Sequence, residues 1–300
     1  MSTNFYPHDY NGIFDNVPEV TFDQFLRVDD GEIISAEIAQ RSEDALIRNV
    51  FRESQQTIPG ALFYNQLTQD QLDSIGQAAE RKPGEEFALV FTPERDLKSE
   101  EVHQFGAKSE VTNEQIKRND KDALNRLLDF LTLTIVRKLD DYVLDIFTKA
   151  DAAGLTPKSA VPVLDGTTSR DTAPSATSLG HLIEHIALGQ EGNLALNYNM
   201  LIMRPTDAAK LRVEERVTGL SLLDDFGVEL RTSRSLTEKS AYLIDTNRAG
   251  EVLWEDPLTT EVIDEKLRHV QVVQAWATPA AAITTPSAIN KITFNMPRGA

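Results

Sequence analysis

The middle of this chain carries a helical pattern so long that it limits the folds open to the rest of the sequence. Between residues 112 and 147, leucine, isoleucine and tyrosine recur at steps of three and four residues, with charged side chains between them. This spacing puts the apolar positions on one face of an α-helix. Thr112 and Gln115 have the spacing of a capping box, so the sequence predicts one helix over 112–147.

A helix of this length would cross an entire compact domain. About 36 residues span ~54 Å, and a compact globule of this chain length has a diameter of about 50 Å. Further apolar residues outside the main stripe indicate that two separate surfaces cover the helix. A coiled coil would have a narrower apolar band and more heptads, and a core helix of a large ordinary domain remains the alternative. The predicted core stripe consists of Leu124, Leu128, Leu131, Ile135 and Leu139.

Composition and charge exclude several classes of protein. The formal net charge is −17 and no cluster of Lys and Arg is present to neutralise phosphates, which argues against direct nucleic-acid binding. The chain has no cysteine, so disulfides, thiolate metal sites and cysteine nucleophiles are excluded. No apolar run approaches the ~20 residues of a membrane span, and the amino terminus lacks the features of a signal peptide. We therefore expect a product of the cytosol without a membrane partner.

The first part of the chain predicts an extended arm followed by a protruding hairpin. Residues 1–34 combine Pro and Gly with scattered aromatic residues, which is typical of an arm that lies against a partner. A short amphipathic helix is expected from Ser35 to Glu53. Two strand-like segments, IPGALFYNQLT and FALVFTPERDLKSEEVHQFGAKSEV, then flank a polar stretch with a Pro83-Gly84 turn. Because a two-stranded hairpin is marginal alone, we expect a partner to support it.

Beyond the long helix the composition changes, which marks a boundary between domains. Residues 149–177 are rich in Gly, Pro, Ser and Thr. Helices are expected from Ser178 to Leu188 and from Thr206 to Val213, with the apolar strand NMLIM between them. From Gly227 onward strands and turns alternate, in GVELRTS, AYLIDT, EVLWED, LRHVQVVQAWATPAAAI and SAINKITF. These elements predict an α+β fold.

The order of these elements resembles the major capsid proteins of tailed bacteriophages, which have the Hong Kong 97-like fold. The most specific stretches are GEEFALVFTPERDLKSEEVHQFGAKSEVTNEQIKRND, which is similar to actinobacteriophage capsid proteins, NMLIMRPTDAAKL and VVQAWATPAAAITTPSAINKITF. The resemblance implies a flat tile, along one side of which the long helix runs. It also implies five regions: an N-arm and short helix (1–54), an E-loop (55–105), a peripheral domain with a spine helix (106–150), an axial domain (151–265) and a return to the peripheral domain (266–300).

The resemblance implies a structural protein that is not an enzyme and needs no cofactor or metal. Such a protein self-assembles into hexamers and pentamers of an icosahedral phage head, which encloses double-stranded DNA without sequence-specific binding. The implied partners are a portal and a scaffolding protein, which is expected to be separate because no charged helical extension precedes the arm; whether a decoration protein also binds the outside stays open at this point. Assembly would take place in the cytoplasm of the bacterial host. Intersubunit contacts are expected from the E-loop at Phe63, Tyr64, Phe87, Leu89 and Phe91, and from the N-arm at Phe5, Tyr6, Tyr10 and Phe14.

Some members of this family join an E-loop lysine to a peripheral-domain asparagine through a self-catalysed isopeptide bond. The matching residues here would be Lys82 near the hairpin tip and Asn290 or Asn295 in the closing segment. A lysine beside Pro-Gly is usually only solvated, so the simpler interpretation of Lys82 is an exposed charge.

Two alternatives to a phage capsid protein stay open at this point. The segment HLIEH, residues 181–185, matches the H-x-x-E-H pattern of inverted zinc peptidases. His181 and His185 could bind zinc and Glu184 could activate its bound water, with Glu255 or Glu261 as a further ligand. The same residues also fit the ordinary polar face of an amphipathic helix. An encapsulin nanocompartment shell would share the capsid fold, although encapsulins tend to begin with an inward-facing helix and this chain begins with an aromatic arm.

Overall fold

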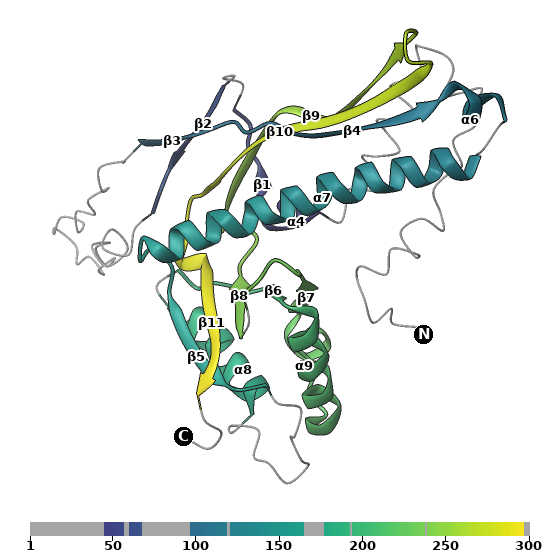
Figure 1. Ribbon diagram of the computed structural model, residues 1–300. Helices are drawn as coiled ribbons and strands as arrows, with labels where there is room; N and C mark the ends of the chain where they lie inside the picture. The colour runs from purple at the N-terminus through teal and green to yellow at the C-terminus, as the bar shows by residue number, and fades with distance from the viewer. Residues whose placement is uncertain are drawn as a thin grey trace. The chain divides into compact units, whose positions relative to one another are not determined.

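The computed structural model of this chain describes two compact units, each with its own sheet (Figure 1). The described residues are 45–56, 60–67, 97–118, 121–164, 177–192, 194–237 and 239–296. The four-stranded unit takes its described residues from Met1–Leu62, Glu100–Asp145 and Glu251–Ala282. The five-stranded unit takes them from Phe63–Ser99, Ile146–Gly250 and Ile283–Ala300. Helices and strands are mixed in both parts, so the predicted α+β class is confirmed.

The four-stranded sheet has the strand order β1-β9-β10-β4. Its strands are β1 (Arg52–Glu53), β9 (Gly250–Glu265), β10 (Val270–Ile283) and β4 (Phe105–Thr112). β4 runs antiparallel to β10, with Phe105 opposite Ala277, and β1 runs parallel to β9. Along β4 shielded residues alternate with exposed ones, which is the pattern of a strand with one covered face. The long helix α7 (Lys121–Ala152) runs beside this sheet (Figure 1).

The helix predicted over 112–147 is in fact two helices, the five-residue α6 (Asn113–Lys117) and the 32-residue α7. The predicted capping box forms, because Gln115 Oε1 accepts from Thr112 N at 3.0 Å and Thr112 Oγ1 accepts from Gln115 N at 3.3 Å. This box starts α6 and not the long helix.

The sequence between the two helices explains this correction. Residues 113–120 contain a single aliphatic side chain, Ile116, so a helix here would have little apolar surface to pack. Asn119 and Asp120 also favour turns and helix caps over helix interiors. The long helix therefore begins at Lys121 and extends for about 48 Å.

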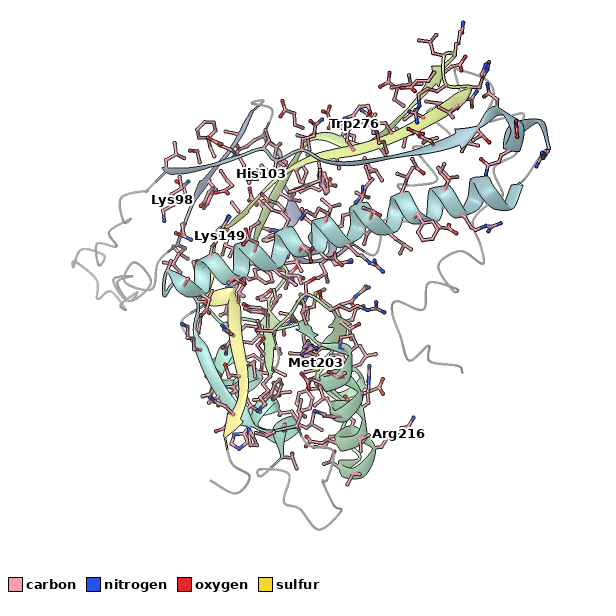
Figure 2. All side chains as sticks on the ribbon, in the orientation of Figure 1. Lys98, His103, Lys149, Met203, Arg216 and Trp276 are labelled. Atoms are coloured by element: carbon pink, nitrogen blue, oxygen red, sulfur yellow. The ribbon has the colours of Figure 1, made fainter. Side chains whose placement is uncertain are left out.

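The five-stranded sheet has the strand order β5-β11-β8-β6-β7. β11 runs parallel to β5 and antiparallel to β8, and β6 runs antiparallel to β8 and parallel to β7. Every residue of β6 and β8 is buried, and Met203 at the end of β6 lies in the core of this unit (Figure 2). The strands are β5 (Lys158–Pro162), β11 (Ile289–Met296), β8 (Ser240–Ile244), β6 (Met200–Met203) and β7 (Glu229–Thr232).

Three helices accompany this sheet, and local sequence signals fix their ends. α8 (Ser178–Glu191) begins after Thr177, whose hydroxyl accepts from Gly180 N at 3.0 Å. α9 (Pro205–Thr218) has proline in its first turn and ends at Gly219, whose φ of 75° suits a residue without a Cβ. α10 (Leu222–Phe226) was not predicted, because five residues are too few to show a helical period. A 3₁₀ turn, η3 (Pro286–Ala288), precedes β11.

The described residues before β4 include one helix and a two-stranded sheet. The predicted helix over 35–53 is described only as α4 (Leu46–Val50), and it ends before Glu53 because Arg52–Glu53 form β1. β2 (Ala61–Asn65) and β3 (Leu97–Glu101) pair with each other, as the predicted hairpin requires. Most of the predicted N-arm and the hairpin tip lie outside the described residues.

The boundaries expected for the axial domain, 151 and 265, differ from those of the two units. β9 belongs to the four-stranded sheet, so the chain enters this unit at Glu251, before the expected boundary at 265. β11 lies between β5 and β8 in the five-stranded sheet, although residues 266–300 were expected in the other domain. The hydrophobic pattern of a strand is local, whereas the strands that pair with it are distant in sequence. The pattern therefore predicts these strands but not their partners in the sheet. None of the described helices is long and apolar enough to cross a membrane.

Candidate functional site

The first candidate surface is the long helix α7. Of the predicted core stripe, Leu128, Leu131, Ile135 and Leu139 are all buried, and the side chain of Leu124 lies outside the described part. Phe130, by contrast, is 67% exposed. The helix therefore has a stripe that is buried at its four described positions and, on another side, a large apolar residue that the described part of the chain does not cover.

Asp140 on α7 is buried and binds α4, which comes much earlier in the chain. Its carboxylate accepts a hydrogen bond from the backbone N of Leu46 at 2.9 Å, at the first turn of α4. The first amides of a helix have no partner within the helix, so a carboxylate at this end satisfies one of them and complements the helix dipole. This contact joins two residues 94 positions apart and could not be read from the sequence.

An aromatic cluster holds the start of β4 against α7. Tyr142 lies 5.2 Å from Phe105 and 5.4 Å from His103, measured between ring centroids, and His103 is labelled in Figure 2. The Tyr142 hydroxyl accepts from Ala281 N at 3.3 Å. Burial raises the pKa of Tyr142 to about 12, so the phenol stays protonated. These contacts fix the position at which the chain passes from the hairpin strand β3 into β4.

The base of the hairpin is fixed on its other strand by Gln66, which sequence reasoning missed. Gln66 is buried, its Nε2 donates to the carbonyl of Ile283 at 3.3 Å, and its Oε1 accepts from Lys98 Nζ. The next residue, Leu67, donates its backbone N to Thr284 O at 2.8 Å. A polar residue after a short strand is unremarkable in sequence, so nothing there predicted a buried anchor.

Only two of the residues expected to make intersubunit contacts are described. Phe63 and Tyr64 lie in β2 and both are half-buried within the chain. The other expected contact residues, Phe87, Leu89 and Phe91 of the E-loop and Phe5, Tyr6, Tyr10 and Phe14 of the N-arm, lie outside the described residues.

An ionic cluster joins the end of α7 to the five-stranded sheet. Asp151 pairs with Lys291 Nζ at 2.6 Å and with Lys158 Nζ at 2.8 Å, from β11 and β5. Burial raises the pKa of the Asp151 carboxyl, but the hydrogen bonds from the two lysines outweigh it and hold the pKa below its ordinary value. The hydrogen bond to Asp151 in turn raises the pKa of Lys291.

The residues of the HLIEH segment lie on α8, where His185 has a structural partner. The imidazole of His185 is half-buried and hydrogen-bonded to the backbone of Ala160 in β5, and burial lowers its pKa. His181 Nδ1 lies 3.6 Å from Glu184 Oε2. Glu255 and Glu261 lie on β9. Among the described residues no three His, Asp or Glu side chains converge as metal ligands would.

The two asparagines considered for a crosslink have different surroundings. Asn290 is buried, and its side-chain Nδ2 donates to Ser159 Oγ at 3.0 Å while Ser159 Oγ lies 3.1 Å from its Oδ1. Asn295 is exposed near the end of β11, and Lys82 lies outside the described residues.

Comparison with known proteins now gives these features a context. Residues 98–292, more than half of the chain, match the sequence model of a family described as phage capsid protein. No curated protein matches the sequence. Many solved structures share the fold at low identity.

Three of these structures illustrate the likeness. The virus-like particle from Pyrococcus furiosus has a TM-score of 0.58 at 11% identity, over 87% of this chain and 96% of that one. The matching chain of Mycobacterium phage Bobi has a TM-score of 0.56 at 13% identity, over 85% and 91%. The capsid of Myoviridae phage XM1 has a TM-score of 0.53 at 12% identity, over 81% and 89%.

These structures establish the Hong Kong 97-like fold, and the resemblance inferred from the sequence is confirmed. The family match begins in β3, continues through β4, α7 and all of the helices and strands up to β10, and ends within β11. It therefore includes the long helix, three of the four strands of the four-stranded sheet and, apart from the last residues of β11, the whole five-stranded sheet. On this ground the chain belongs to the family of phage capsid proteins.

Proposed function

We propose that this chain is a major capsid protein and forms the hexamers and pentamers of a closed icosahedral head that encloses double-stranded DNA. The observation that carries the proposal is the family match over residues 98–292, together with a fold shared with phage capsids. A separate scaffolding protein and a portal would take part in assembly in the host cytoplasm, and a decoration protein would bind the outside. The hairpin from β2 to β3 and the N-terminal arm supply contacts between neighbouring copies.

The charge of the chain supports a passive relation to the packaged DNA. With a formal net charge of −17, the shell has weak affinity for phosphates, so counterions and packaging hold the genome in place. Empty shells mixed with duplex DNA should show little binding in a sedimentation assay. Tight binding that weakens steeply with added salt would contradict this part of the proposal.

Electron microscopy of the expressed protein, with and without its scaffold, tests the main proposal. Uniform hollow particles are the expected result, and a protein that remains a stable monomer under every condition would contradict it. The likeness to the virus-like particle from Pyrococcus furiosus keeps a nanocompartment shell as a second candidate. Particles purified from an infected host would contain duplex DNA in the first case and protein cargo in the second.

We further propose that the protein has no catalytic activity. The hydrogen bond of His185 to the backbone of Ala160 supports a structural role for the HLIEH segment. Metal analysis of the purified protein, with His185→Ala as the comparison, tests this proposal. Stoichiometric zinc that is lost in the variant would contradict it.

A further inference from the structure

Two different surfaces lie at opposite ends of the five-stranded sheet. At one edge, beside β5 and β11, is an open cavity of about 360 Å³, which we call the socket. At the other edge the short helix α10 lies against β7, and we call α10 the knob. β5 and β7 are the outer strands of the same sheet, so strands spaced about 4.8 Å apart separate these edges by roughly 20 Å (Figure 1).

The knob exposes apolar residues that a subunit alone has no reason to expose. Leu222 is buried, but Leu223 is 49% exposed and Phe226 is 38% exposed. Asp224 and Asp225 lie between them and are exposed as well. Adjacent exposed apolar residues with charged neighbours are typical of a surface that contacts another protein.

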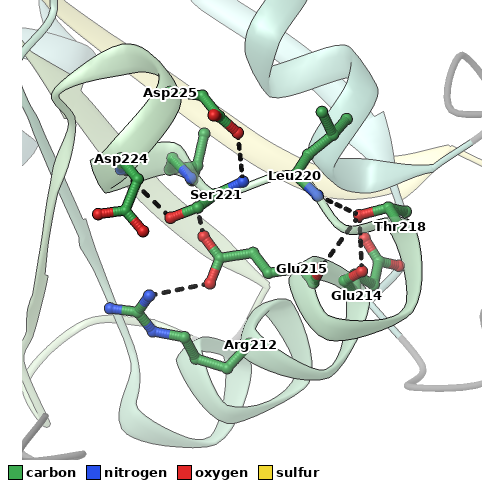
Figure 3. A network of polar contacts seen from close by, with 9 residues as sticks. Arg212, Glu214, Glu215, Thr218, Leu220, Ser221, Asp224 and Asp225 are labelled. Carbon is green, nitrogen blue, oxygen red and sulfur yellow. Dashed lines mark hydrogen bonds and ion pairs between the residues drawn. The ribbon is translucent and has the colours of Figure 1, made fainter. Parts of the chain in front are cut away.

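A network of hydrogen bonds makes the knob rigid in spite of its five residues (Figure 3). Ser221 Oγ accepts from Asp224 N at 3.2 Å, and Asp225 Oδ2 accepts from Ser221 N at 2.7 Å. The buried carboxylate of Glu215 accepts from Leu222 N at 3.0 Å and from Arg212 Nη1 at 2.9 Å. A surface held in one conformation loses little entropy when it binds, so this network prepares α10 for a contact.

The socket is equally well defined. One wall is the ring of Tyr198, which packs so closely on Gly189 that an added Cβ there would lie 2.4 Å from Tyr198 Cε2. Leu188, at the lip, is 54% exposed. Ser287 also lines the cavity, but its hydroxyl oxygen is itself buried and has no hydrogen-bond partner among the described residues. An apolar lip and an aromatic wall suit an apolar side chain.

Charge also matches between the two surfaces. Arg248 is exposed at the rim of the socket, where its guanidinium donates to the carbonyl of Leu194, a lining residue. The carboxylate of Asp224 on the knob can pair with this guanidinium in another copy. The exposed acids nearest in sequence to the socket lining, Glu184 and Glu191 of α8, have the same sign of charge as the knob. The opposite charge at the socket is therefore provided by Arg248.

We propose that the knob of one copy inserts Leu223 and Phe226 into the socket of the next copy, with Asp224 beside Arg248 of that copy. Because the two surfaces differ and lie at opposite edges of one sheet, the contact is head to tail, and repetition of such a contact closes a ring when the rotation allows it. The inference rests on the proposed assembly into hexamers and pentamers, and it names a contact within each ring. The knob and socket are too small to bind strongly alone, so the ring depends on repetition of the contact.

Single variants give the first test. Leu223→Lys removes the knob's apolar tip, and Leu188→Asp places an acid at the socket lip opposite the acidic knob. Both residues are exposed, so the unfolding transition should stay unchanged while closed particles decrease at least tenfold in micrographs. Val213→Lys is the control, because Val213 is 44% exposed on α9 and belongs to neither surface. If both variants form particles as the unaltered protein does, the proposal is wrong.

A mixture of the two variants gives a sharper test, which does not depend on closed shells. Each variant keeps one intact surface, so the Leu223→Lys protein can accept the knob of the Leu188→Asp protein, and no further contact can follow. Analytical ultracentrifugation should detect one-to-one heterodimers in the mixture and monomers of each variant alone. Because a single contact is weak, the mixture is examined up to the highest protein concentration at which each variant alone stays monomeric, and absence of the heterodimer there would overturn the proposal.

Exchange of the two charges tests the pairing itself. Asp224→Arg and Arg248→Asp should each reduce particle yield, and the double variant should recover most of it. If the double variant is as defective as the worse single variant, Asp224 and Arg248 are not partners. If the unaltered protein forms no shell while the heterodimer still forms, the proposed function is refuted and this contact stands. If shells stay intact and no variant has an effect, this contact is refuted and the proposed function stands.

Discussion

In the five-stranded sheet every residue of β6 and β8 is buried, whereas in the four-stranded sheet β4 alternates between shielded and exposed residues. The first sheet has a single dense core that includes Leu182, Leu211 and Phe294. The second leaves large apolar residues uncovered in its unit, among them Phe130 on α7 and Leu267, which is 100% exposed at the turn between β9 and β10. The chain thus buries a dense core in one unit and a shallower one in the other, and both units keep exposed apolar residues, such as Phe130 in one and Leu223 in the other, that neighbouring copies in a shell can cover.

The largest expected effect tests whether α7 has one buried face in the four-stranded unit. Leu131→Asp buries an unpaired carboxylate where the side chain is only 3% exposed, at a cost of several kcal/mol. Insoluble or protease-sensitive protein is the expected result. Phe130→Asp, at the adjacent but exposed position, is the matched control and should leave the subunit folded. A Leu131→Asp variant with an unchanged urea transition would mean that the stripe is not buried.

Two phenylalanines, one in each unit, allow the two cores to be compared directly. Phe294 in β11 is 1% exposed, and Phe294→Ala should lower the free energy of unfolding by about 3–5 kcal/mol. Phe105 in β4 is only half-buried, so Phe105→Ala should cost about 1–2 kcal/mol. Urea titrations of both variants measure the difference. Equal costs would remove the contrast between a dense core and a shallow one.

The ionic cluster at Asp151 gives a smaller effect that depends on pH. Asp151→Asn should lower the free energy of unfolding by about 2 kcal/mol at pH 7, because the carboxylate loses charge-assisted hydrogen bonds to two lysines. The folded-state pKa of Asp151 is depressed, so its contribution is complete above the unfolded-state pKa of about 3.9 and is lost as the pH falls through the folded-state pKa. The gap between variant and unaltered protein should therefore shrink in acid. Asp264→Asn, at an exposed position on β9, is a control that should show no such gap.

The smallest effect on subunit stability is expected from the hairpin. Replacing residues 68–86 with a short Gly-Ser turn keeps the Leu67 N to Thr284 O bond and should leave circular dichroism and the unfolding transition nearly unchanged. Particle formation, followed by small-angle scattering and micrographs, should nevertheless fail. If the shortened protein unfolds, the segment belongs to a core; if it forms shells of full stability, the hairpin does not bind neighbours.

Sequence periodicity predicted those elements whose signals are local. The helices α8 and α9 and the apolar strand β6 appear close to their expected positions, because Thr177, Pro205 and Gly219 mark helix ends. The long helix was displaced, since a capping box at Thr112 was not followed by an apolar stripe until Leu124. Resemblance to capsid proteins supplied the overall architecture.

What the sequence could not predict are the contacts that join distant segments. Gln66 with Ile283, Asp140 with Leu46, and Asp151 with Lys291 are polar residues whose role depends on a partner more than 90 positions away. The knob was missed for a different reason. Leu223 and Phe226 on a five-residue helix show no period, and their exposure becomes informative only when the opposite edge of the sheet is known to hold a cavity.

The position of β11 sets the time at which a newly made chain can finish folding. This strand lies between β5 and β8, yet it is made more than 120 residues after β5. At about 5–20 residues per second, a ribosome needs at least several seconds to cover that distance. Until then β5 packs with α8 but has no strand to pair with among the described ones, Asp151 lacks Lys291, and Asn290, which lines the socket, is missing. The socket thus forms last, so that copies still attached to ribosomes cannot begin to join one another through it.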